Sequence, residues 1–304
     1  MKWGEAEKYI TKQLETCYDE SEAVNIAAIL IENITSFSRS KILLKKDEVL
    51  SASQLNGLNQ YIQRLLQYEP VQYVLNEAHF YGMKLYVDKD VLIPRPETEE
   101  LVEWIINDVR ASGKNVFQKK ATDADVTTQL KLLDVGTGSG CIALALKKKM
   151  PRAEVWGCDI SDRALNVARR NGSELDIRVD FQSVDYLDPA QQKHLPTVDI
   201  VVSNPPYVPS KNKNEMQPNV LQYEPHTALF VDDNDALVFY KALLHFGKHR
   251  LYTNGIIYME IDENSASDIK ALFENDGYVV EVRKDMQGKE RMVRAHPHPP
   301  EGRT

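Results

Sequence analysis

The run Asn204-Pro205-Pro206-Tyr207 follows the apolar stretch 198–202 and carries the residue types best suited to chemistry. Two consecutive prolines cannot continue a strand, so the chain is expected to leave the strand at a stiff corner. There the Asn204 side-chain oxygen and nearby backbone carbonyls would offer hydrogen-bond acceptors to a planar NH2 group. An enzyme that methylates such a weakly nucleophilic nitrogen must hold both N–H groups, which aims the nitrogen and stabilises its developing positive charge. A simple turn is the alternative interpretation.

A glycine-rich segment, Leu-Leu-Asp-Val-Gly-Thr-Gly-Ser-Gly over residues 132–140, predicts a buried strand, a tight turn and a helix over 141–149. About twenty residues later the apolar stretch 155–159 ends in Asp159, where doubly wound folds place a carboxylate on ribose hydroxyls. The Gly-x-Gly-x-Gly spacing differs from the Gly-x-Gly-x-x-Gly that supports a pyrophosphate. It favours a nucleoside ligand without a diphosphate, such as S-adenosylmethionine. A nicotinamide-dependent dehydrogenase and a purely structural turn are the competing interpretations.

Taken together, these segments resemble the bacterial peptide chain release factor glutamine methyltransferases (the HemK/PrmC family) from about residue 69 to 294. The discriminating run is Leu-Ile-Pro-Arg-Pro-Glu-Thr-Glu at 92–99, because Asn-Pro-Pro-Tyr also occurs in adenine-N6 methyltransferases. Further matching segments are Pro-Val-Gln-Tyr at 70–73, Phe-Tyr-Gly at 80–82 and Tyr-Glu-Pro at 223–225. Two features depart from the pattern: Asn76 stands where many members carry glycine, and the stretch 111–130 is longer and more polar than usual.

The resemblance implies a class I S-adenosylmethionine-dependent methyltransferase fold, Rossmann-like with a seven-stranded sheet, and a small N-terminal helical bundle. It implies methylation of the glutamine in the Gly-Gly-Gln motif of class I release factors. Asn204 would accept one amide hydrogen and the Pro205 carbonyl the other, while Tyr207 packs along the acceptor. The expected cofactor-binding residues are Gly136, Thr137, Gly138, Ser139, Gly140, Asp159, Asp185, Tyr186 and Asn204. The expected substrate-binding residues are Asn204, Pro205, Pro206, Tyr207 and Arg95.

Three of these residues have open alternatives. Tyr186 could stack on the adenine or belong to the core. Asp185 could accept from the adenine amine or cap a turn. Arg95 stands between two prolines, ahead of a helix that begins near Pro96 with acidic residues in its first turn. We expect this loop to fold over the cofactor and shape the acceptor entrance, with Arg95 either contacting the substrate or bracing the loop.

The order of elements predicts an organisation in four parts. These are an N-terminal helical domain for docking the release factor (1–68), a hairpin connector with the Ile-Pro-Arg-Pro-Glu-Thr-Glu loop (69–100), the methyltransferase domain (101–296) and a disordered tail (297–304). Ser21 and Ser51 are expected N-caps in the helical domain. A hairpin is expected over 80–87, a helix over 164–170, and strands over 177–181 and 256–261, with a closing antiparallel pair over 277–282 and 291–293. His296 and His298 are expected in the tail.

Composition agrees with an intracellular enzyme, and we expect the protein to be cytoplasmic and monomeric. The 304 residues carry a net charge of −8, whereas a nucleic-acid enzyme usually shows a basic footprint. No apolar run of membrane-spanning length and no signal region is apparent, and the three cysteines lack metal-ligand spacing. We therefore expect no membrane, metal or stable nucleic-acid partner. An adenine-N6 methyltransferase, which would need a basic recognition domain, and a catalytically silent cofactor-binding scaffold remain as alternatives.

Overall fold

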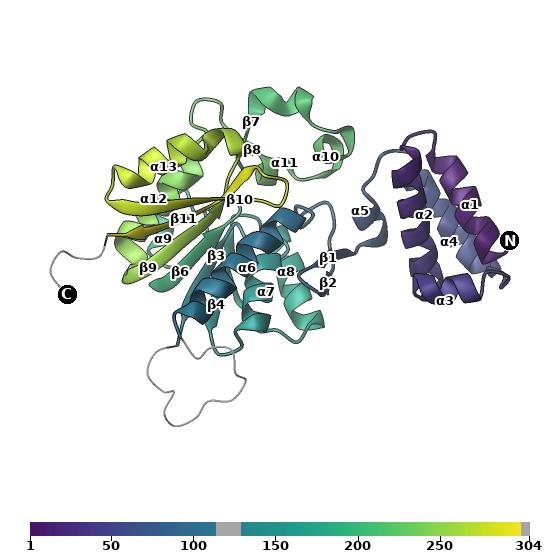
Figure 1. The fold of residues 1–304 in the computed structure, drawn as a ribbon, viewed down its shortest axis with the longest axis horizontal. Helices are drawn as coiled ribbons and strands as arrows, with labels where there is room; N and C mark the ends of the chain where they lie inside the picture. Colours follow the sequence, from purple (N-terminus) through teal and green to yellow (C-terminus); the bar gives the residue numbers. More distant parts are fainter. Residues whose placement is uncertain (114–128, 299–304) are drawn as a thin grey trace. The chain divides into compact units, whose positions relative to one another are not determined.

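The computed structural model describes residues 1–113 and 129–298 (Figure 1). The chain forms two compact units, one built from residues 1–77 with 217–223 and the other from 78–216 with 224 onward. Every helix in the described ranges is too short or too polar to span a lipid bilayer. The longer part of the segment noted over 111–130 lies outside the described residues, because only its first three and last two residues are included.

The first unit is helical, as the sequence predicts. Its core consists of apolar side chains from successive helices, among them Ile10, Leu30, Leu58 and Ile62. The helices are α1 (Trp3–Leu14), α2 (Glu20–Thr35), α3 (Arg39–Leu44), α4 (Ala52–Leu65), α5 (Val71–Leu75) and α10 (Pro218–Tyr223). The stripes at helical spacing therefore meet in a single apolar cluster, which is what stabilises a small bundle.

One of the two expected helix caps is correct. Ser51 caps α4 in a capping box, with its hydroxyl accepting from the Gln54 N–H. The prediction for Ser21 was wrong, because Asp19 caps α2 and accepts from the Glu22 N–H at 2.9 Å. Asp19 has the extended backbone that a cap requires, and Ser21 already lies inside the first helical turn.

The second unit is an α/β fold around a seven-stranded sheet in the described residues, with strand order β10-β11-β9-β6-β3-β4-β5. The five strands from β9 to β5 run parallel, and β11 and β10 close the sheet antiparallel. The strands are β3 (Lys131–Val135), β4 (Glu154–Asp159), β5 (Asp180–Ser183), β6 (Val198–Ser203), β9 (Leu251–Glu260), β10 (Tyr278–Lys284) and β11 (Glu290–Pro297). This arrangement confirms the fold class predicted from the sequence.

Helices cover both faces of this sheet (Figure 1). On one face α6 (Pro96–Ala111), α7 (Cys141–Lys149) and α8 (Asp162–Glu174) pack with the hairpin of β1 (Ala78–Phe80) and β2 (Met83–Leu85). On the other face lie α12 (Val238–Arg250) and α13 (Ala266–Glu274). Shorter elements are α9 (Pro189–Gln192), β7 (Val208–Pro209), η2 (Ser210–Glu215), α11 (His226–Leu229), β8 (Phe230–Val231) and η3 (Glu263–Ser265). The two apolar clusters bury the sheet from both sides.

Two local predictions need correction. The strand expected over 177–181 begins only at Asp180, because the Ile177 N–H bonds to the Gly172 carbonyl and closes the end of α8. His296 was expected in a tail, but it lies in β11 opposite Val279. His298 follows that strand, and residues 299–304 lie outside the described residues.

Candidate active site

A cavity opens at the carboxyl ends of β3, β4 and β6, where doubly wound folds place their ligands. Its empty volume is about 860 Å³, which includes the open mouth. Its lining combines the glycine-rich turn, the end of β4, the loop after β5 and the corner after β6. Among the lining residues are Gly136, Gly138, Asp159, Asp185, Tyr186, Asn204, Pro205 and Pro206. Segments far apart in the sequence thus meet in one site within the second unit.

The glycine-rich turn has the backbone that the sequence predicts. Gly136, Gly138 and Gly140 all have positive φ, at 69°, 52° and 80°. A Cβ on Gly136 would meet no heavy atom within 4 Å, so this part of the turn faces open space rather than packed core. Glycine is needed because other residues rarely adopt this backbone conformation, and it lets a ligand approach the chain closely.

Asp134 was not among the predicted site residues, yet it organises this turn. Its carboxylate accepts from the Thr137 hydroxyl at 2.7 Å and from the Ala143 N–H at 3.1 Å. The side chain is 1% exposed, and burial raises the pKa of Asp134 to about 7. The sequence held a signal for it, since a carboxylate inside the apolar run 132–135 must find partners.

Asp159 ends β4 at the edge of the cavity. One carboxylate oxygen accepts from the Gly138 N–H and the other from the Ser161 N–H, both at 2.9 Å. Burial raises the pKa of Asp159, although these backbone hydrogen bonds oppose the shift. The acid therefore ties the glycine-rich turn to the next strand and also lines the cavity.

The loop after β5 supplies Asp185 and Tyr186 to the cavity lining. Asp185 accepts from the Leu187 N–H at 2.9 Å, so it does cap a turn. Tyr186 is 5% exposed and packs against Phe246, with ring centroids 5.6 Å apart. Both structural alternatives thus hold, and neither one excludes the cofactor contacts expected for these residues.

The corner after β6 brings Asn204 next to two buried polar side chains. The Asn204 amide nitrogen donates to the Thr98 hydroxyl at 3.1 Å, and that hydroxyl donates to the Glu260 carboxylate at 2.6 Å. Thr98 and Glu260 are 2% and 3% exposed. Sequence reasoning gave neither residue a role in the site. The available signal was an acid at the end of the otherwise apolar strand 256–260.

The rest of the corner lies where the sequence predicts. Pro205 and Pro206 line the cavity, and Tyr207 follows them before β7 begins at Val208. Tyr207 is half-buried, and burial raises its pKa to about 12, so its hydroxyl stays protonated at neutral pH. The side chains of this corner are therefore uncharged: the Asn204 amide, the rings of Pro205 and Pro206, and the protonated Tyr207 phenol.

Arg95 pairs with a buried acid. Its guanidinium lies 2.5 Å from the Glu224 carboxylate, whose side chain is 1% exposed and also accepts from the Ile93 N–H. The pair connects the loop before α6 to the segment before α11. The bracing alternative for Arg95 is therefore present in the structure, while a substrate contact remains a prediction.

We expect Arg95→Ala to lower the free energy of unfolding by about 2 kcal/mol, because it leaves the Glu224 carboxylate buried without its partner. Urea unfolding measures this loss, and Arg95→Ala combined with Glu224→Gln should recover part of it. Lys270→Ala, which breaks the exposed pair with Glu274, is the control and should cost less than about 0.5 kcal/mol. Unchanged stability together with a raised KM for the acceptor would show that Arg95 acts on the substrate instead.

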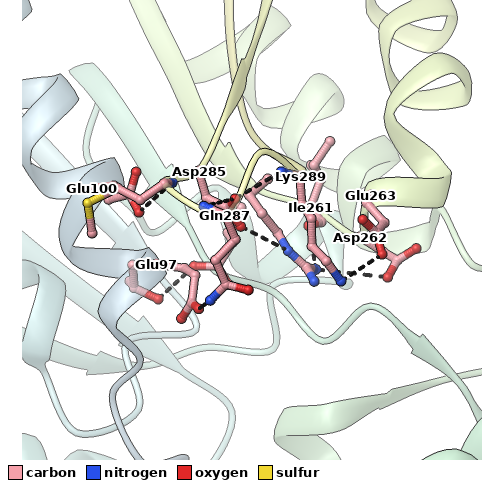
Figure 2. Close-up of polar contacts among 12 residues, drawn as sticks. Glu97, Glu100, Ile261, Asp262, Glu263, Asp285, Gln287 and Lys289 are labelled. Carbon is pink, nitrogen blue, oxygen red and sulfur yellow. Dashed lines mark hydrogen bonds and ion pairs between the residues drawn. The ribbon is translucent and has the colours of Figure 1, made fainter.

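A polar network joins the start of α6 and the start of η3, which follows β9, to the β10–β11 hairpin (Figure 2). Gln287 donates to Glu97 at 3.2 Å, and the Met286 N–H donates to Glu100 at 3.2 Å. On the other side Lys289 donates to Glu263 at 3.1 Å. Asp285 organises the turn by accepting from the backbone N–H groups of residues 287 and 289. Thus α6, which carries Thr98, and η3, which follows the strand of Glu260, are both bonded to the β10–β11 hairpin.

Glu260 and Asp134 make the stability of the second unit depend on pH. Burial raises the pKa of Glu260 from 4.5 and that of Asp134 from 3.8, each to about 7. Between the unfolded pKa and the folded pKa of each group, the folded state therefore binds more protons than the unfolded state. The stabilisation that comes from this proton uptake is fully present below the unfolded pKa and is lost as pH rises through about 7.

We therefore expect the free energy of unfolding to fall between about pH 5 and pH 8, by on the order of 3 kcal/mol from Glu260 alone. Urea unfolding at the two pH values measures the change. Glu260→Gln should reduce the slope, because glutamine does not titrate. A stability that rises over this range would contradict the assigned burial effect.

Comparisons with known proteins agree with the geometry. The family model of the PrmC N-terminal domain matches residues 5–75, and that of the methyltransferase small domain matches 113–225. The chain is 37% identical over 286 residues to a release factor glutamine methyltransferase of Flavobacterium psychrophilum, covering 93% of this chain and 95% of the relative. It is 39% identical over 289 residues to the protein of the same name from Bacteroides thetaiotaomicron, covering 95% and 98%.

A solved structure supports the fold alone. The hMettl16 catalytic domain in complex with the MAT2A 3'UTR hairpin 6 aligns with a TM-score of 0.53 at 13% identity, over 82% of this chain and 84% of that one. At this identity the likeness concerns the arrangement of the sheet and helices. It carries no information about the substrate.

Proposed function

Since the chain belongs to the release factor glutamine methyltransferase family, we propose that it methylates the side-chain amide nitrogen of the Gly-Gly-Gln glutamine in class I release factors. S-Adenosylmethionine is the proposed methyl donor. Release factors act in translation termination, so the proposed site of action is the cytoplasm. The single observation that carries the proposal is the corner at residues 204–207. There the uncharged Asn204 side chain, which can accept hydrogen bonds, borders the cavity at the ends of β3 and β4.

The cavity suits a nucleoside sulfonium. The open space beside Gly136 and Gly138 lets a ligand approach the backbone of the turn closely, and Asp159 and Asp185 supply carboxylate oxygens to the cavity lining. Tyr186 and Ile160 add apolar surface. When bound, S-adenosylmethionine supplies an activated methyl group and its own leaving group. The protein therefore needs no nucleophilic side chain of its own.

The corner would hold and orient the acceptor. The Asn204 side-chain oxygen accepts one amide hydrogen and the Pro205 carbonyl accepts the other, which fixes the plane of the NH2 group. Tyr207 packs along the acceptor side chain and limits its freedom. Holding the nitrogen in line replaces a bimolecular encounter, which can contribute about 7–11 kcal/mol when the geometry is ideal. The nitrogen sheds its proton during or after transfer, so the corner needs no strong base.

A labelling assay tests the proposal. The protein and methyl-labelled S-adenosylmethionine are incubated with each of four candidate acceptors in parallel. These are a class I release factor, the same factor with a Gln→Ala substitution in its Gly-Gly-Gln motif, bare DNA and bare RNA. We expect label in the unmodified factor only. Label in nucleic acid, and none in the factor, would overturn the assignment in favour of an adenine-N6 methyltransferase.

A further inference from the structure

The hydrogen-bond partner of the Thr98 hydroxyl is unusual for a threonine near the start of a helix. Such side chains commonly bond to their own backbone, and Thr35 does so here by donating to the Ile31 carbonyl at 2.6 Å. Thr98, in the first turn of α6, instead donates across the unit to Glu260 on β9 at 2.6 Å. The contact joins two buried residues that are 162 positions apart.

The direction of this hydrogen-bond chain follows from its chemistry. Above the pKa of about 7 that burial gives Glu260, its ionised carboxylate can only accept, so the single hydroxyl proton of Thr98 is used in the hydrogen bond to Glu260. The Thr98 oxygen can then only accept from Asn204, which requires the amide nitrogen of Asn204 to face it, at 3.1 Å. The Asn204 oxygen is thereby turned away from Thr98 and left for another partner. A neutral amide alone would have no such preference, because its two ends are nearly the same size.

The surrounding structure holds both ends of the chain in place. Glu97 and Glu100 of α6 are bonded from the β10–β11 turn, and the segment after β9 is bonded to the same hairpin through Glu263 (Figure 2). The Tyr240 hydroxyl donates to the backbone carbonyl of Glu260 at 3.2 Å. A carboxylate buried to 3% exposure is costly to keep without a hydrogen-bond donor, and the Thr98 hydroxyl supplies one.

We propose that Thr98 and Glu260 are positioning residues that set the amide orientation of Asn204, so that its oxygen rather than its nitrogen meets the NH2 group of the acceptor. This proposal rests on the proposed function of the corner and adds to it the source of its specificity for a hydrogen-bond donor. With the amide reversed, two NH2 groups would face each other and the acceptor nitrogen would lose one of its hydrogen-bond partners. Thr98 acts through Asn204 and does not itself touch the substrate.

The test compares Thr98→Val, which keeps the shape but removes the hydroxyl, with Thr98→Ser, which retains it. At pH 8, where Glu260 is ionised, label transfer to a release factor gives kcat and KM, calorimetry gives the Kd for S-adenosylmethionine, and thermal melting verifies folding. We expect Thr98→Val to lower kcat about tenfold or more, with KM and Kd changed less than about threefold. Thr98→Ser should restore kcat to within about threefold of the unmodified protein. Thr35→Val removes a buried threonine hydroxyl in the first unit, away from the cavity, and should leave kcat unchanged.

The double variant separates this inference from the proposed function. If Thr98 acts only through Asn204, Thr98→Val should have no further effect in an Asn204→Ala background. A reduced kcat in Asn204→Ala with a normal kcat in Thr98→Val, or fully additive losses, would overturn the positioning role while leaving the corner's function intact. A normal kcat in Asn204→Ala would instead remove the proposed function on which the inference rests.

Discussion

Asn204→Ala is expected to lower kcat for methyl transfer to the release factor by about 10²–10³-fold, comparable to removing one preorganised polar group from an active site. The variant loses the acceptor that aims the amide nitrogen, while the glycine-rich turn and Asp159 stay in place. The Kd for S-adenosylmethionine should therefore remain measurable and change less than about tenfold. Single-turnover label transfer and calorimetry separate the two effects.

Asn166→Ala is the matched control for this substitution, because it removes an exposed asparagine on α8 away from the cavity. Its kcat should equal that of the unmodified protein. Unchanged turnover in Asn204→Ala would contradict the role assigned to the corner, whatever the effect on binding.

Asp159→Ala should weaken the binding of S-adenosylmethionine and largely spare kcat, the opposite of the effect expected for Asn204→Ala. Hydrogen bonds to charged groups contribute about 1.5–3 kcal/mol, so losing the carboxylate should raise the KM for S-adenosylmethionine about 10- to 100-fold. The Gly138 N–H also loses its acceptor, which loosens the turn. At saturating cofactor, kcat should fall much less than in Asn204→Ala.

Asp180→Ala, at the exposed start of β5, removes a carboxylate without touching the cavity and serves as the control. An unaltered KM in Asp159→Ala would show that this acid only supports the turn. A loss confined to kcat would assign it to the transfer step instead.

The sequence predicted the parts of the site that follow from local backbone chemistry. The glycines at 136, 138 and 140 require positive φ, and a strand that meets two prolines must end. The helix bounds over 141–149 were correct because the helix begins after Gly140 and its last turn is a run of lysines, which are favourable at a helix C-terminus. These features depend on residues that are close in sequence, so they can be predicted without knowledge of the fold.

Contacts between distant segments could not be predicted in the same way. Thr98 and Glu260 are 162 positions apart, and Arg95 and Glu224 are 129 apart. Pairing of such residues depends on strand order and on which helix crosses which strand end. The error at Ser21 has a different origin. Asp19 and Ser21 are two positions apart and are both residue types that cap helices, so the sequence does not show at which of them the helix begins.

The most direct test of the central claim is to locate the added methyl group on the product. A class I release factor treated with the protein and S-adenosylmethionine is digested and fragmented by mass spectrometry. A single methyl on the side-chain amide nitrogen of the Gly-Gly-Gln glutamine is the result predicted here. A methyl on any other residue or atom, or an unmodified glutamine after full incubation with active protein, would contradict it.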